Sequence, residues 1–290
     1  MIYTTLISRD ELLPNIHHPN WAIIDCRFSL EDAGRGRRDY LHSHIAGAIY
    51  AHLNEDLCGS VVPGVTGRHP LPTVEQLAER FSSWGIDERV QVVAYDDWIP
   101  ASGAVAARLW WSLRWLGHQA VAVLDGGWAA WQEAGLPAGH GVESRLPRTF
   151  VPRLRPELLA SSEEVNRRRQ DQTWMVFDSR LYDRYRGENE TIDPVAGHIP
   201  GAKSAPYIDN AAPGGNFLPA EALNKRFKGL LGGVPAERAV FYCGSGVTAA
   251  HNLLAMTHAG IGEGRLYVGS WSEWITDPRH PVCVGDEREA

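Results

Sequence analysis

The two halves of this chain carry the same short motifs in the same order. WAIIDCR, which ends at residue 27, returns as WMVFDSR, and HIAGA at 44–48 returns as HIPGA at 198–202. Further along, VVAYDD corresponds to AVFYCG, and GGWAAW corresponds to GSWSEW. A set of motifs that recurs once, after roughly half the chain, is typical of a duplicated domain, because the repeats of a solenoid are far shorter. We therefore expect two domains with one fold in the 290 residues.

The stretch between the two copies is the expected linker. Residues 136–160 are rich in Pro, Gly and Arg and have neither helical nor strand periodicity. We expect a first domain at 1–140 and a second domain at 155–290. The composition, with 44% hydrophobic and 22% charged residues, is that of ordinary globular domains and excludes a disordered chain or a small disulfide scaffold.

Each half alternates short apolar runs with helical patterns. The apolar runs predict strands at 21–25, 91–95 and 120–124 in the first half and at 174–178, 239–242 and 265–267 in the second. The helical patterns lie at 74–84, 104–115, 162–169, 219–228 and 247–259. Uniformly apolar strands separated by helices are typical of a parallel sheet that is covered on both faces. The sequence predicts two α/β domains, each a parallel sheet flanked by helices.

Charge and hydropathy exclude several kinds of partner. The net charge is −7, and nucleic-acid phosphates require a basic surface, so we expect no nucleic-acid partner. No stretch of 18 apolar residues exists that would span a membrane. The N-terminus has no basic segment followed by an apolar one, which favours a cytoplasmic protein. A small anionic ligand remains compatible, because a local cluster of arginines can override the overall charge.

The four cysteines narrow the chemistry. Cys26, Cys58, Cys243 and Cys283 have long, irregular spacings without a C-x-x-C pair. Structural zinc sites show paired spacings, so we expect no metal. Without a secretory leader, these cysteines are expected to be free thiols.

Cys243 has the surroundings of a nucleophile. It follows a predicted buried strand, and ligands of α/β sheets bind at the carboxyl ends of the strands. The loop residues before the next predicted helix are Gly244, Ser245, Gly246, Val247 and Thr248. Glycines allow the backbone to curl so that amide N–H groups point inward, and the helix N-terminus adds positive potential. A thiol in such a place loses its proton more easily, and the resulting thiolate is the nucleophile.

The first half provides an internal comparison for this loop. Its corresponding residue is Asp96, in AYDDWIPASG, which has no Gly-x-Gly pattern and no sulfur nucleophile. We therefore expect one active site per chain.

Two alternatives to this interpretation are a cysteine phosphatase and a non-catalytic binding module. A cysteine phosphatase needs an arginine six residues after the cysteine, where this chain has Ala249. A non-catalytic binding module, which duplication permits, does not explain the intact Cys243 loop.

Together these motifs resemble the rhodanese-type sulfurtransferases with two tandem domains, of which only the second is catalytic. The resemblance covers nearly the whole chain and rests on DCR and DSR, HIAGA and HIPGA, TGRHPLP, DGGW, CGSGVTA and GSWSEW. It implies that Cys243 accepts a sulfane sulfur from a small anionic donor, becomes a persulfide and passes the sulfur to a thiol, cyanide or a protein thiol. It implies no cofactor.

The residues of the Cys243 loop give an indication of the sulfur donor. In this family C-R-K-G-V-T is typical of thiosulfate users, whereas C-G-S-G-V-T resembles the 3-mercaptopyruvate sulfurtransferases. Thiosulfate is a dianion and gains from added positive charge, while the Ser245 hydroxyl can hydrogen-bond the carbonyl or sulfur of the monoanionic keto acid. We expect 3-mercaptopyruvate as the donor, with thiosulfate as the alternative.

The resemblance also implies substrate-binding residues. Arg184, in RYRG, matches the arginine that holds the donor anion, and Arg186 follows two residues later. Arg68 and His69, in TGRHPLP, match positions that face the catalytic loop, where a histidine polarises the serine hydroxyl. One departure concerns the segment ENETIDPVAGHIPG. Mercaptopyruvate enzymes carry a second arginine shortly before HIPG, and this segment has none, so donor recognition rests more on Arg184.

Overall fold

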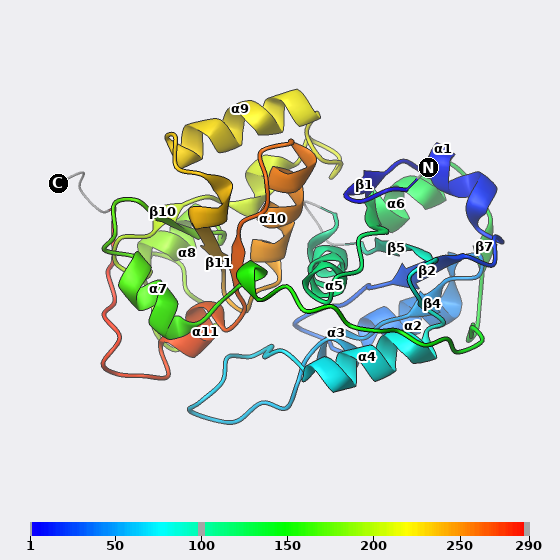
Figure 1. The fold of residues 1–290 in the computed structure, drawn as a ribbon, viewed down its shortest axis with the longest axis horizontal. Helices are drawn as coiled ribbons and strands as arrows, with labels where there is room; N and C mark the ends of the chain where they lie inside the picture. Colours follow the sequence, from blue (N-terminus) through cyan, green and yellow to red (C-terminus); the bar gives the residue numbers. More distant parts are fainter. Residues whose placement is uncertain (1, 98–101, 287–290) are drawn as a thin grey trace. The chain divides into compact units, whose positions relative to one another are not determined.

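The computed structural model describes residues 2–97 and 102–286, and these form two compact units (Figure 1). The first unit comprises Met1–Gly59, Leu71–Arg155 and Ala211–Phe217; the second comprises Ser60–Pro70, Pro156–Asn210 and Leu218–Ala290. The segment Ser60–Pro70, from the first half of the sequence, therefore belongs to the second unit. Among the described residues, no helix has the length and apolar character needed to cross a membrane.

The first unit is built on a parallel five-stranded sheet. Its strand order is β1 (Leu6–Ile7), β6 (Val121–Leu124), β5 (Gln91–Tyr95), β2 (Trp21–Asp25) and β4 (Ile49–Tyr50). A small antiparallel pair joins β3 (His44–Ile45) and β7 (Ala138–Gly139). The helices are α1 (Arg9–Leu12), α2 (Arg35–His42), α3 (Leu53–Asp56), α4 (Val74–Ser83), α5 (Ala104–Trp115) and α6 (Gly127–Glu133), with a 3-10 turn at Leu13–Asn15.

The second unit repeats this architecture. The parallel order is β10 (Lys203–Ser204), β9 (Met175–Asp178), β11 (Ala239–Tyr242), β12 (Arg265–Tyr267) and β8 (Leu159–Ala160). Its helices are α7 (Ser162–Arg168), α8 (Tyr182–Arg186), α9 (Ala220–Leu231), α10 (Thr248–His258) and α11 (Ser270–Trp274). Short 3-10 turns lie at Pro156–Leu158, Tyr207–Asn210 and Ala236–Arg238. Helix α10 packs against β11, β12 and α9, while α7 packs against β9 and α11 (Figure 1).

The predicted fold class is confirmed, since each unit is a parallel sheet flanked by helices. Every residue of β5 and β11 is buried, which explains why these central strands read as continuous apolar runs. The two-residue edge strands carry too little pattern to be found in a sequence. Two such strands, β7 and β8, lie near the ends of the expected linker 136–160, and the change from the first unit to the second falls within it, after Arg155.

Equivalent strands end in equivalent ion pairs. Asp25, the last residue of β2, binds Arg27 (Oδ2–Nη2, 2.7 Å), and Asp178, the last residue of β9, binds Arg180 (Oδ2–Nη2, 2.5 Å). All four side chains are buried. An ion pair that recurs in both copies indicates a structural role for Arg180, as for Arg27.

Tryptophans fill the cores of both units. Trp128 and Trp131 lie in the core cluster of the first unit, and Trp271 and Trp274 occupy the matching places in the second. The guanidinium of Arg180 also lies over the Trp271 ring, 4.9 Å from its centroid. These residues pack the cores of the two units.

Candidate active site

Cys243 lies at the carboxyl end of the central strand of the second sheet. Strand β11 ends at Tyr242 between β9 and β12, and helix α10 begins at Thr248. The thiol is almost fully buried, with Cys243 2% exposed. The predicted order of strand, cysteine, loop and helix is therefore present, with Val247 as the residue that precedes the first turn of α10.

The loop curls back toward the thiol. Gly246 has a φ of +77°, a conformation that side chains disfavour, and its amide N–H donates to Cys243 Sγ at 3.1 Å. This contact is of the kind that would stabilise a negative charge on sulfur, because the dipole of the N–H donor points at the sulfur atom.

The beginning of α11 anchors the Cys243 loop. The amide of Cys243 donates to Ser270 Oγ at 3.1 Å, and its carbonyl accepts from the amide of Trp271 at 2.9 Å. The carbonyl of Gly244 accepts from the amide of Ser272 at 3.0 Å. Ser270 has a positive φ of 56°, where the equivalent residue of the first unit is Gly127, with a φ of 55°. The loop is thus fixed by backbone contacts on both sides of the cysteine.

His69 lies against the loop serine. His69 Nδ1 is 2.8 Å from Ser245 Oγ, and both residues are buried. The segment that carries His69 is held to α11, because the amide of Arg68 donates to Ser272 Oγ at 3.0 Å. The structure therefore brings together the histidine and the serine that the sequence paired.

Two guanidinium groups reach the residue after Cys243. Arg68 Nη2 lies 2.8 Å from the position that a Cβ on Gly244 would take, and both Nη atoms of Arg184 lie 3.7 Å from it. A side chain at this position would displace Arg68. Because Gly244 has no side chain, the positively charged guanidinium groups can lie beside it. The loop residues 244–248 are themselves uncharged.

Two carboxylates that the sequence analysis missed hold these arginines. Arg184 Nη2 binds Glu190 Oε1 at 2.8 Å and Asp193 Oδ2 at 3.1 Å, and Asp193 also binds Arg68 through Oδ1. Both carboxylates come from ENETIDPVAG, the segment in which a second arginine was sought. The sequence signal for them was weak, because five acidic residues lie within ten positions of Arg184 and nothing distinguishes Glu190 and Asp193 from the other three.

Burial affects the two carboxylates differently. Burial raises the pKa of Asp193 above its ordinary value and outweighs the opposing effect of Arg68. Burial also acts to raise the pKa of Glu190, but hydrogen bonds from Arg184 and from the amides of Asp193 and Ile192 leave it lowered.

Arg186 is directed elsewhere. Its guanidinium binds Glu188 at 2.7 Å and Asp286 at 2.6 Å, and its side chain is 30% exposed. The structure brings Arg68, His69 and Arg184 to the loop and does not bring Arg186 with them.

The other cysteines have different surroundings. Burial raises the pKa of the Cys26 thiol well above its ordinary value and raises the pKa of Cys58 to about 11. Both thiols therefore resist ionisation. Cys283 pairs through its backbone with His198 near the C-terminus.

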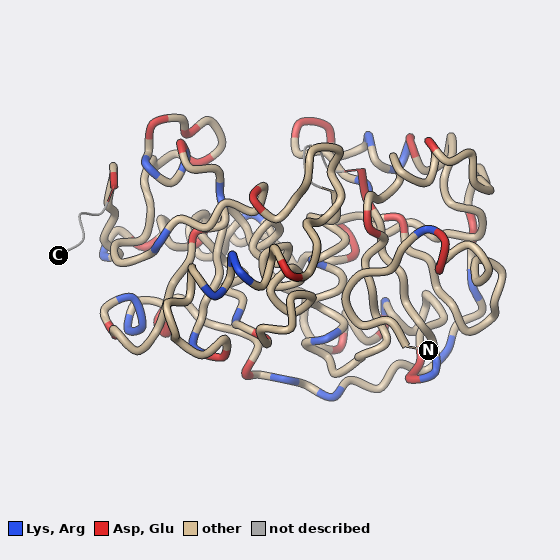
Figure 2. Tube along the Cα trace, turned by 90° about the horizontal axis from the view of Figure 1, so that it is seen from above, with Lys and Arg blue, Asp and Glu red and all other residues tan. Residues whose placement is uncertain are grey.

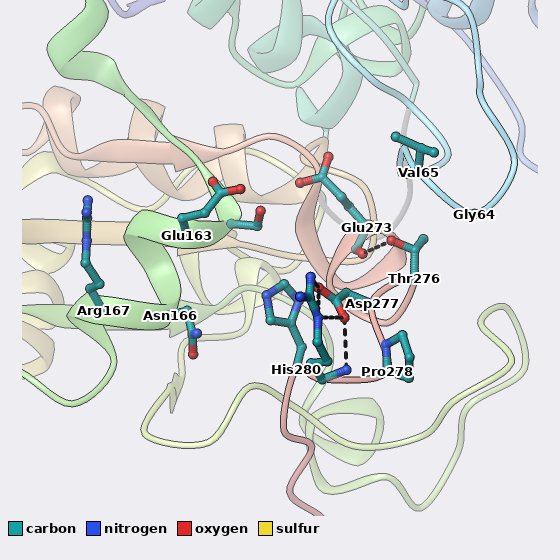
Figure 3. Close-up of a pocket in the computed structure, with 12 residues that line it drawn as sticks. Gly64, Val65, Glu163, Asn166, Arg167, Glu273, Thr276, Asp277, Pro278 and His280 are labelled. Atoms are coloured by element: carbon teal, nitrogen blue, oxygen red, sulfur yellow. Dashed lines mark hydrogen bonds and ion pairs between the residues drawn. The ribbon is translucent and has the colours of Figure 1, made fainter.

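A separate cavity of about 770 Å³ also lies in the second unit (Figure 3). It is bordered by α7, by the residues after α11 and by Gly64 and Val65. Figure 3 shows the Glu163 and Glu273 carboxylates and the His280 ring among its walls. None of the described lining residues is a predicted site residue. Within 2–97 and 102–286, no three His, Cys, Asp or Glu side chains group as a metal site would require.

Comparison with known proteins identifies the family. A model described as a rhodanese-like domain matches residues 8–134 and again residues 161–277. The chain belongs to the rhodanese-like family. Two matches in series agree with the internal repeat, and they confirm the prediction of tandem rhodanese-like domains.

Its relatives in this rhodanese-like family are sulfurtransferases. The chain is 48% identical to a "Probable 3-mercaptopyruvate sulfurtransferase" of Pseudomonas aeruginosa over 97% of this chain and 98% of that protein. It is 38% identical to "Putative thiosulfate sulfurtransferase SseB" of Mycobacterium tuberculosis, over 91% of each. The solved 3-mercaptopyruvate sulfurtransferase from Leishmania major is 30% identical, with a TM-score of 0.83 over 96% of this chain and 76% of that chain. The predicted sulfurtransferase class is confirmed, and the chain is an enzyme of that class.

Proposed function

We propose that this rhodanese-like enzyme moves a sulfane sulfur from a small anionic donor through a persulfide on Cys243 to a thiol or cyanide acceptor, and that 3-mercaptopyruvate is its donor. The observation that carries the proposal is the meeting of three features at one point. The Gly246 amide donates to Cys243 Sγ, and the guanidinium groups of Arg68 and Arg184 converge on Gly244. The names of the relatives support the same donor class.

The first step forms one S–S bond and breaks one C–S bond. The Cys243 thiolate attacks the sulfur of 3-mercaptopyruvate, and the C–S electron pair passes to the carbon as the enolate of pyruvate. The thiol proton of the donor goes to that carbon, so pyruvate leaves and Cys243 carries an anionic persulfide. The amide of Gly246 then faces the sulfur atoms that hold the charge.

The second step returns the thiolate. An acceptor thiolate or cyanide attacks the outer sulfur of the persulfide, the S–S bond breaks, and its electron pair returns to Cys243. The products are an acceptor persulfide or thiocyanate. Since the donor product leaves before the acceptor reacts, the kinetics are expected to be ping-pong.

Ser245 and His69 act on the donor carbonyl in this scheme. Negative charge develops on the carbonyl oxygen as the enolate forms, and a hydroxyl aimed at that oxygen stabilises it. His69 Nδ1, at 2.8 Å from Ser245 Oγ, fixes the direction of the hydroxyl.

Thiosulfate is the second candidate donor, and Arg68 favours it. A dianion gains from the positive charge that Arg68 places beside Gly244. Steady-state kinetics with both donors, measured on one preparation, decide between them. A kcat/KM that is higher for thiosulfate would contradict 3-mercaptopyruvate as the preferred donor.

A covalent intermediate gives the direct test of the mechanism. Intact mass spectrometry after addition of either donor, without acceptor, is expected to show the gain of one sulfur atom. Peptide mapping should place that sulfur on Cys243, and cyanide should remove it. A persulfide found on Cys26, Cys58 or Cys283 in place of Cys243 would overturn the assignment.

Arg184 is expected to act mainly on donor binding. Its replacement by Ala removes a charge-assisted hydrogen bond to the donor anion, so the KM for 3-mercaptopyruvate should rise about 10- to 100-fold. Arg186→Ala is the comparison variant, because Arg186 binds Glu188 and Asp286 at the surface. Its KM should change less than about twofold. An unchanged KM in Arg184→Ala, in a protein with normal circular dichroism, would remove Arg184 from the site.

A further inference from the structure

One carboxylate is shared by the two guanidinium groups that face Gly244. Asp193 Oδ2 lies 3.1 Å from Arg184 Nη2, and Asp193 Oδ1 contacts Arg68 Nη1. The Asp193 side chain is 2% exposed, whereas those of Arg68 and Arg184 are 29% and 15% exposed. The two cations can thus meet a ligand while the anion between them stays covered.

We propose that Asp193 is a specificity-determining residue that lowers the positive charge of the donor site and thereby favours a monoanionic donor over a dianionic one. The proposal rests on the proposed function, because it concerns the donors of the same site. It assigns the selection to a residue that lies outside the Cys243 loop.

The charges around the site balance. Arg180 binds Asp178 at 2.5 Å and Glu190 at 3.2 Å, and Glu190 in turn binds Arg184 at 2.8 Å. With Arg68 and Asp193 added, three guanidinium groups face three carboxylates. Figure 2 shows that Lys and Arg are interspersed with Asp and Glu along the described trace. The site therefore has donors for hydrogen bonds to an anion without an excess of positive charge.

The absence of basic residues from the Cys243 loop does not by itself remove positive charge from the space beside Gly244. Gly244 and Ser245 are uncharged, but Arg68 Nη2 occupies the space beside Gly244 where a basic side chain would begin. Without the Asp193 carboxylate, three guanidinium groups would face only two carboxylates. One unbalanced positive charge would then lie beside Gly244. The Coulomb energy of that charge with a dianion is about twice that with a monoanion at the same distance. Asp193 is the nearest group that cancels it.

The position of Asp193 is fixed by its own segment. The amides of Ile192 and Asp193 donate to Glu190 Oε1 at 2.9 and 3.0 Å. These bonds tie the segment to the carboxylate that already binds Arg184. Asp193 is thereby held against the guanidinium groups by contacts within its own segment.

Donor selectivity tests the proposal. We would measure kcat/KM for thiosulfate and for 3-mercaptopyruvate in the wild type and in Asp193→Asn and Asp193→Ala. The kcat/KM for thiosulfate divided by the kcat/KM for 3-mercaptopyruvate is expected to rise at least about tenfold in both variants. Most of this rise should come from a lower KM for thiosulfate. Arg68→Gln removes one positive charge and is expected to shift the ratio in the opposite direction.

Glu188→Gln is the matched control. It makes the same change of charge in the same segment, but Glu188 binds Arg186 and its side chain is 55% exposed. Its ratio should stay within about twofold of the wild type.

Binding measurements separate this proposal from the proposed function. Calorimetric titration of the full-length Cys243→Ala protein with thiosulfate and with 3-mercaptopyruvate needs no turnover. Adding Asp193→Asn to that protein should raise the relative affinity for thiosulfate by the same tenfold factor. An unchanged ratio in both kinetics and titration, in variants with normal circular dichroism, would leave Asp193 a structural partner only. A wild type that forms no persulfide with either donor would instead overturn the proposed function, while the titration would still decide the role of Asp193.

Discussion

Replacement of Cys243 by Ser is expected to abolish sulfur transfer. The kcat/KM with either donor should fall by roughly 10⁴-fold or more, because the variant has no sulfur on which a persulfide can form. The hydroxyl can still accept the Gly246 N–H, so the loop should keep its shape. Steady-state assays with both donors and intact mass spectrometry after donor addition measure the loss.

Two other cysteines supply controls for this variant. Cys26→Ala and Cys58→Ser are expected to retain near-normal transfer, because burial raises the pKa of both thiols and neither lies in the Cys243 loop. Substantial transfer by Cys243→Ser, or its loss in a folded Cys58→Ser protein, would contradict the mechanism.

Replacement of Asp96 by Ala is expected to lower the free energy of unfolding by about 2–4 kcal/mol. Asp96 follows β5 at the position that Cys243 occupies after β11. Its Oδ1 accepts from the amide of Gly103 at 2.6 Å, and its Oδ2 accepts from Val105 at 2.8 Å and Ala106 at 2.9 Å. The substitution would leave buried amides at the start of α5 without their acceptor. Urea denaturation followed by circular dichroism measures the change.

The neighbouring aspartate is a matched control for stability. Asp97 binds Arg35 at 3.0 Å in a pair whose arginine is 52% exposed. Asp97→Asn should therefore cost no more than about 1 kcal/mol. If Asp96→Ala costs as little as Asp97→Asn, the role of Asp96 at this helix is wrong.

Asp96 also bears on the choice of catalytic domain. Its carboxylate already binds the amides at the start of α5, where the second unit presents the uncharged residues of the Cys243 loop. The comparison supports the second domain as the catalytic one. The prediction that the first loop lacks a glycine curl falls partly on residues 98–101, which lie outside the described residues.

Much of the fold could be predicted from the sequence, because its central strands are buried on both faces. The predicted ranges 21–25, 91–95 and 239–242 coincide with β2, β5 and β11, and the helix predicted at 104–115 coincides with α5. The duplication strengthened these predictions, because a strand found in one half is expected at the corresponding motif of the other half. Edge strands such as β8 have two residues and depend on a neighbour for their pairing, so no local pattern marks them.

The site was harder to predict wherever it depends on contacts between distant segments. Cys243 and its loop form a continuous motif, whereas the contact of Asp193 with Arg68 joins residues that lie far apart in the sequence. Arg184 and Arg186 lie two residues apart in one short helix, and nothing in RYRG indicates which of them reaches the loop. The side-chain partners of the two arginines determine which one reaches the loop. Arg184 binds Glu190, whereas Arg186 binds Glu188.

The assignment of Ser60–Pro70 to the second unit limits how this enzyme can be divided. A gene fragment that starts at residue 156 encodes Cys243, Arg184 and Asp193 but not Arg68 or His69. Conversely, the segment Ala211–Phe217 from the second half of the sequence belongs to the first unit. The two halves of the sequence therefore do not coincide with the two compact units, and a break after residue 155 separates Ser60–Pro70 from the rest of the second unit. A protein that begins at residue 156 is therefore expected to lack the arginine and the histidine to which the proposed mechanism gives a role.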